Sequence, residues 1–146
     1  MKKLILISFI ALLSLSCKSK VEATAIPKIN GYWEIEKVIL PDGQEKKYTY
    51  NDIYDYFEIK DTNGIRKKVM PQLDGTFLVN DTFEIIKIKE TDGKYYIYCS
   101  TSLVKWKEEI ISLNDTELVL LNASNKEYHY KRATPINLTG NGKKTQ

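Results

Sequence analysis

The amino-acid sequence predicts an all-β fold: a single antiparallel up-and-down β-barrel of about eight strands over residues 30–132. Two observations predict it. Apolar and aromatic runs of about 5–10 residues alternate with short turn signals, as in a meander. No segment of useful length shows the 3.6-residue periodicity of an amphipathic helix. Eight or nine strands that share one apolar face bury it by closing into a barrel, which also removes exposed edges.

Short segments rich in Gly, Asn and Asp mark the predicted reversals between strands. Gly and Asn tolerate the positive φ values of tight turns. The predicted turns are residues 41–43, 61–64, 74–75, 80–81, 91–93, 114–115 and 122–125. Their spacing predicts a continuous series of neighbouring strands.

Alternation of apolar and polar residues assigns an inner face to most of these strands. In residues 31–40, Trp33, Ile35 and Ile39 share a face and are expected to point inward. The pair Ile110-Ile111 breaks the alternation of its strand, which indicates a β-bulge.

One compact basic run, Arg66-Lys67-Lys68, lies in the body of the chain. Alternation places Ile65 and Val69 on the inner face and Arg66 and Lys68 on the outer one. The run is interpreted as a solvated edge strand, with a surface for anionic lipid or glycan as the alternative.

The start of the chain predicts export. Lys2 and Lys3 precede an apolar run that is too short to span a bilayer, so residues 1–16 are expected to be a secretion signal. The stretch Leu13-Ser14-Leu15-Ser16-Cys17 resembles a bacterial lipobox, which makes Cys17 the expected site of lipidation. Diacylglycerol with an amide-linked fatty acid such as palmitate supplies the two or more chains that lasting anchorage needs. Residues 17–29 then form the lipidated end and a flexible tether, and residues 133–146 a tail.

Composition narrows the functional classes. Removal of residues 1–16 takes away Lys2 and Lys3, so the formal net charge falls from +3 to +1. A near-neutral exported domain is not expected to bind nucleic acid. The mature chain has the length of one domain with one core.

The residues offer no catalytic or metal-ligating set. His129 is the sole histidine, and Cys99 is the cysteine that remains once Cys17 carries lipid. Cys99 is interpreted as a small apolar core residue, with a reactive thiol as the alternative. The sequence therefore predicts a protein that is not an enzyme and holds no cofactor or metal.

The first predicted strand opens with Asn30-Gly31-Tyr32-Trp33, and the last hairpin covers residues 117–121 and 127–132. This Gly-x-Trp entry and the basic end of the hairpin resemble those of small bacterial lipocalin-like lipoproteins. The resemblance implies an eight-stranded barrel with a cavity open at one end. It also implies a closed end at which Trp33 packs under Arg132 through a cation–π contact.

Four tyrosines are candidates for the wall of that cavity: Tyr96, Tyr98, Tyr128 and Tyr130. Their rings would offer apolar surface and their hydroxyls polar contacts to a small amphipathic ligand. The alternative is that they fill a narrow barrel or lie on its outer face.

Two functions remain open at this stage. The first is a monomeric lipoprotein of the bacterial cell envelope, anchored in the outer membrane facing the periplasm, whose barrel binds a small hydrophobic or amphipathic ligand. The second is a non-catalytic structural or interaction lipoprotein with a solid barrel and an envelope partner. A cavity of several hundred cubic ångströms would favour the first.

Overall fold

The computed structural model describes residues 20–133. The predicted secretion signal, Cys17 and residues 134–146 of the predicted tail lie outside the described residues. The elements are η1 (Ala23–Ile29), β1 (Gly31–Ile39), β2 (Glu45–Lys47), β3 (Tyr54–Lys60), β4 (Asn63–Pro71), β5 (Phe77–Val79), β6 (Glu84–Thr91), β7 (Lys94–Ser100), β8 (Lys105–Leu113), β9 (Glu117–Asn122) and β10 (Glu127–Arg132). Within residues 20–133, no helix is both long and apolar enough to cross a membrane.

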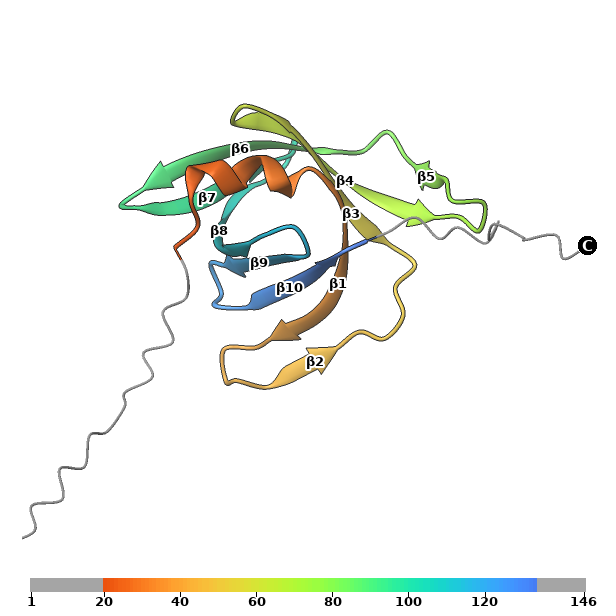
Figure 1. Ribbon diagram of the computed structural model, residues 1–146, viewed down its shortest axis with the longest axis horizontal. Helices are drawn as coiled ribbons and strands as arrows, with labels where there is room; N and C mark the ends of the chain where they lie inside the picture. Colours follow the sequence, from red (N-terminus) through yellow and green to blue (C-terminus); the bar gives the residue numbers. More distant parts are fainter. Residues whose placement is uncertain (1–19, 134–146) are drawn as a thin grey trace, which may run out of the picture.

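Eight strands close into an antiparallel barrel, as the sequence predicts (Figure 1). Their order is β10-β9-β8-β7-β6-β4-β3-β1, and pairing of β10 with β1 completes the ring. The short strands β2 and β5 lie outside this ring, where β2 extends a hairpin from β1 and β5 one from β4. We call the β4–β5 hairpin the β4–β5 arm; Figure 1 shows it projecting from the barrel.

The two ends of the barrel differ. The helix η1 lies across one end, together with the β3–β4, β6–β7 and β8–β9 turns. The side chain of Asn30 bonds the backbone of Ile59 in β3, and Lys28 pairs with Asp115 in the β8–β9 turn. We call this the closed end. Because neighbouring strands are antiparallel, the β4–β5 arm and the β7–β8 and β9–β10 turns lie at the opposite, open end.

Large apolar side chains fill the closed half of the barrel. The side chains with no exposed surface come from η1 and five different strands: Ile29, Trp33, Phe57, Ile86, Ile97, Leu118 and Leu120. Alternate positions of each strand point inward, so the strands supply this core and present polar residues outside. The closed half therefore has a continuous apolar core.

The sequence placed residues 23–29 in a flexible tether, and the structure corrects this. They form a 3₁₀ helix whose Ile26 and Ile29 are buried. With three residues per turn, these two isoleucines lie on one side of the helix and enter the barrel. The packed domain thus begins before Asn30.

Two β-bulges shift the register. The predicted one lies in β8, between Ile110 and Ser112. A second lies in β1 between Ile35 and Lys37, opposite β10. One extra residue reverses the alternation that follows it. Val38 is consequently the buried residue near the end of β1, where alternation alone predicted Ile39.

Candidate functional site

Trp33 and Arg132 meet at the closed end, as expected. The Arg132 guanidinium carbon lies 4.0 Å from the centroid of the Trp33 ring. The Trp33 indole N–H donates a hydrogen bond of 2.7 Å to the carbonyl of Ile29 in η1. Arg132 donates hydrogen bonds to the carbonyls of Lys28, Asn30 and Asp115. The pair joins the first strand, the last strand and η1.

Gly31 is required beside this pair. Its φ of +112° is one that other residues rarely adopt, and a Cβ there would lie 3.0 Å from a guanidinium nitrogen of Arg132. The glycine of the Gly-x-Trp entry therefore makes room for the arginine. This is a structural role and assigns no ligand.

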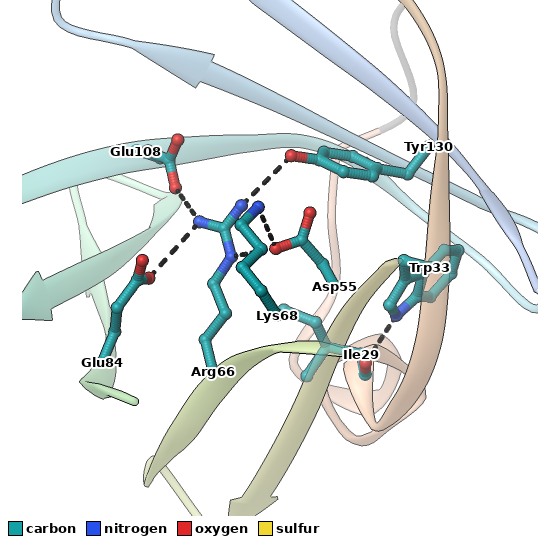
Figure 2. A network of polar contacts seen from close by, with 8 residues as sticks. All are labelled: Ile29, Trp33, Asp55, Arg66, Lys68, Glu84, Glu108 and Tyr130. Carbon is teal, nitrogen blue, oxygen red and sulfur yellow. Dashed lines mark hydrogen bonds and ion pairs between the residues drawn. The ribbon is translucent and has the colours of Figure 1, made fainter. Parts of the chain in front are cut away.

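The side chain of Arg66 enters the barrel interior and gathers charged partners around it, as Figure 2 shows. Its Nε donates to Asp55 at 2.9 Å, and Nη1 donates to Glu108 at 3.0 Å. Nη2 donates to the Tyr130 hydroxyl at 3.1 Å. We call the following group the charge cluster: Asp55, Arg66, Lys68, Glu84, Glu108 and Tyr130.

This location overturns the sequence-based interpretation of Arg66 as a residue of a solvated strand. Arg66 is 6% exposed, and Asp55 and Glu108 are buried as well. In β4, Arg66 lies opposite Phe57 of β3 and Glu84 of β6, and its side chain points inward. A buried guanidinium is stabilised only where charged or polar partners surround it.

The carboxylates of the charge cluster respond differently to burial. Desolvation would raise the pKa of Asp55, but Arg66 and Lys68 more than offset it and hold that pKa below its usual value. Burial raises the pKa of Glu84, and Arg66 offsets this only partly. The Glu84 Oε2 atom is buried without a hydrogen-bond partner and lies 3.8 Å from the Arg66 Nη1.

Exposed apolar side chains surround the open end. They lie before β3, in the β4–β5 arm, before and at the start of β6, and in the β7–β8 turn. We call this set the apolar rim: Tyr50, Ile53, Met70, Leu73, Leu78, Val79, Phe83, Ile85, Leu103 and Val104.

A hollow of about 290 Å³ lies within this rim, along the β4–β5 arm. Its wall is mainly apolar and includes Ile53, Met70 and Leu78. Lys68 lines the hollow and also bonds Asp55 of the charge cluster. The hollow and the charge cluster are therefore adjacent, with Lys68 between them.

The four candidate tyrosines separate into two pairs. Tyr130 is buried inside the barrel, and Tyr128 packs against the core. Tyr96 and Tyr98 lie on the opposite face of β7 from the buried Ile97, where Lys107 and Lys89 cover their rings. The sequence left the direction of β7 ambiguous, and the structure places Tyr96 and Tyr98 on its outer face, which was the alternative for these residues. Only the β10 pair faces inward.

The remaining candidate groups are structural. Cys99 is buried, and burial raises its pKa to about 12, which is the behaviour of a core thiol. A ring nitrogen of His129 lies 3.1 Å from Glu127 on the same strand. In the part of the chain that the structure describes, no three His, Cys, Asp or Glu residues are placed to hold a metal ion.

Sequence reasoning missed the charge cluster, although a signal for it existed. Asp55 shares its strand face with Phe57, and Glu108 shares its face with Ile110. Acidic residues at inner positions of separate strands require a buried cation. Arg66 was the available inward candidate.

Comparison with known proteins finds similar solved structures but no sequence relative. The sequence matches no protein-family model and no curated protein. The structure is similar to that of a lipocalin-like protein from Bacteroides uniformis, with 12% identity and a TM-score of 0.47, over 73% of this chain and 99% of that one. It is also similar to an uncharacterized protein from Bacteroides eggerthii, with 14% identity and a TM-score of 0.45, over 71% of this chain and 98% of that one. The strand order and the β1–β10 pairing make this domain a closed, eight-stranded, antiparallel up-and-down β-barrel.

Proposed function

We propose that this protein is a non-catalytic, monomeric lipoprotein of the bacterial cell envelope that binds a small amphipathic ligand at the open end of its barrel. The observation that carries the binding proposal is the contact between the apolar hollow and the charge cluster. Apolar walls with a few convergent polar groups are the usual composition of a small-molecule site. An amphipathic molecule would place its apolar part along Met70 and Leu78 and its polar part near Lys68 and Glu84.

The acidic side chains of the charge cluster favour a ligand whose polar group donates hydrogen bonds. Arg66 already directs its three nitrogens at Asp55, Glu108 and Tyr130. Glu84 retains a buried oxygen without a hydrogen-bond partner. A hydroxyl, amide or ammonium group would supply the missing donor, whereas a carboxylate or phosphate would meet acidic side chains.

Native mass spectrometry of the mature chain, produced without its lipid, tests for the ligand. We expect an additional small-molecule mass, which Leu78→Asp reduces. Leu103→Asp is the matched control, because Leu103 is also an exposed leucine of the apolar rim but does not line the hollow. A mass that persists unchanged in Leu78→Asp would contradict binding in the hollow.

The buried apolar core of the closed half favours a second candidate function, that of a structural or interaction lipoprotein. Trp33, Phe57 and Leu118 of that half have no exposed surface. On this alternative the apolar rim contacts an envelope partner. The mature protein would then carry no small molecule, and Leu78→Asp and Leu103→Asp would weaken partner binding alike.

The anchor is tested separately. The lipobox-like stretch before Cys17 predicts that Cys17→Ser abolishes lipidation and releases the protein from the membrane fraction. Metabolic labelling with a fatty-acid analogue measures this directly. A serine variant that still acquires the label would disprove Cys17 as the lipidation site.

A further inference from the structure

The chain is attached to the barrel almost from the first described residue. Val21 packs against the hydrophobic core, and with Ile110 and Leu121 it lines a groove along β8 and β9. Lys20 lies beside Gly93 of the β6–β7 turn, so closely that a Cβ on Gly93 would be 2.8 Å from the Lys20 Nζ. From Lys20 onward the backbone therefore follows the closed end.

The helix η1 continues this attachment. Ile26 and Ile29 are buried, and the carbonyls of Lys28 and Ile29 accept hydrogen bonds from Arg132 and Trp33. The attachment to the barrel thus begins three residues after Cys17, well before the end of the predicted tether of residues 17–29.

From these contacts we infer that the closed end of the barrel lies against the membrane and that the open end points away from it. This inference rests on the proposed lipidation of Cys17. Three residue steps connect Cys17 to Lys20, and an extended chain of that length spans about 10 Å. A flexible tether of residues 17–29 would instead have let the barrel turn freely. The surface that meets the lipid headgroups is formed by η1 and the β3–β4, β6–β7 and β8–β9 turns.

The proposed orientation does not rely on charge. Two lysines of the closed end are already paired, Lys28 with Asp115 and Lys94 with Glu109. The short covalent connection is sufficient, so the orientation is expected on neutral and on anionic bilayers alike. Because a nine-residue strand tilted in a barrel rises about 20 Å, the apolar rim lies at about that distance from the headgroups. The ligand then enters from the aqueous side and not from the membrane that holds the anchor.

The test uses the full-length lipidated protein in phosphatidylcholine vesicles that carry a nitroxide on the lipid headgroup. A fluorophore is attached either at Lys60→Cys, in the β3–β4 turn region, or at Ser102→Cys, in the β7–β8 turn. Both native residues are exposed, and Cys99 is too buried to react with the label. We expect strong loss of fluorescence at position 60 and little at position 102. Vesicles that contain phosphatidylglycerol should give the same contrast.

A lengthened connection provides the control. Insertion of about ten Gly and Ser residues between Lys18 and Ser19 should allow the barrel to turn and should bring the two probes to similar quenching. Lipidated protein without the insertion that shows equal quenching at both positions, or stronger quenching at position 102, would overturn the orientation alone. Protein that carries no fatty acid would contradict the anchor, and the orientation with it, while ligand binding by the barrel would be unaffected.

Discussion

At the scale of single residues, Asp55 and Glu84 both lie near the Arg66 guanidinium, but only Asp55 accepts a hydrogen bond from it. Asp55 accepts hydrogen bonds from Arg66 and Lys68 and is almost fully buried. Glu84 lies farther from Arg66 and has a buried oxygen without a hydrogen-bond partner. Asp55 therefore stabilises the charged interior, whereas the charge of Glu84 is tolerated there at a cost.

We predict that Asp55→Asn lowers the free energy of unfolding at pH 7 by about 3–5 kcal/mol, since it leaves Arg66 buried beside a neutral partner. The folded-state pKa of Asp55 is lowered, so its contribution is complete above the unfolded-state pKa of about 3.9 and is lost as the pH falls through the folded value. Urea unfolding of both proteins from pH 7 down to pH 3 measures this. A difference that stays constant over this range would contradict it.

Glu84→Gln is the change that corresponds to Asp55→Asn. We predict that its effect on the free energy of unfolding depends on pH in the opposite direction. The pKa of Glu84 is raised, so the cost of its charge is complete above the folded pKa and disappears below the unfolded value of about 4.3. The substitution should leave the free energy of unfolding at pH 7 within about 1 kcal/mol of the parent. A loss as large as that of Asp55→Asn would show that Glu84 is a structural partner of Arg66.

The contact between Trp33 and Arg132 is tested by a double-mutant cycle with Trp33→Phe and Arg132→Met. A partly desolvated cation–π contact should give a coupling of about 1–2 kcal/mol. Arg132→Lys should recover only part of the stability, because Lys keeps the charge but loses the planar contact and the forked hydrogen bonds. Additive losses in thermal unfolding would mean that the two side chains do not stabilise each other.

At the scale of elements, η1 acts as a lid of the closed end. Two of its side chains enter the barrel, and its last carbonyls accept hydrogen bonds from Trp33 and Arg132. A seven-residue 3₁₀ helix has little stability of its own. Its order thus comes from packing on the barrel, and the barrel in turn depends on it to cover the Trp33 ring.

We predict that a chain starting at Asn30 is less stable than one starting at Lys20 by about 3–6 kcal/mol, the expected value of burying two isoleucine side chains. Lys28→Ala in the longer chain is the control, because its ion pair with Asp115 is exposed and should contribute less than about 1 kcal/mol. Chemical unfolding of the three proteins gives the comparison. Equal midpoints for the two chain lengths would show that η1 contributes nothing to stability.

The elements also show how far a sequence alone can predict this fold. Turns such as Asp92-Gly93 and Asn122–Asn125 were found because positive φ values and Asx hydrogen bonds depend on local residues. The helix η1 was missed because two isoleucines three residues apart carry no periodicity until a barrel exists to receive them. Arg66 was assigned to the wrong face because its partners lie on other strands, 11 to 64 residues away. The site depends on such non-local pairs, so its residues were harder to predict than the strands.

At the scale of the whole molecule, the two halves of the barrel differ in their interior and exposed residues. The closed half has a continuous apolar core, joined by the β1–β10 pairing that completes the ring. The open half carries charged interior residues, exposed apolar side chains and two three-residue strands. The continuous apolar core thus lies at the end that we place against the membrane. The exposed apolar side chains lie at the end that we propose binds the ligand.

Hydrogen exchange should show this division directly. We predict that the amides of β8, β9 and β10 exchange most slowly, because each strand is paired on both sides and supplies fully or nearly buried side chains. The β4–β5 arm should exchange fastest among the strands, since β5 pairs only with β4 and its Leu78 and Val79 are exposed. Addition of the ligand should slow exchange in the arm and leave β9 unchanged. If the arm is protected as strongly as β9 in the ligand-free protein, this division is contradicted. If protection of the arm rises with protein concentration, a second copy of the chain covers the apolar rim.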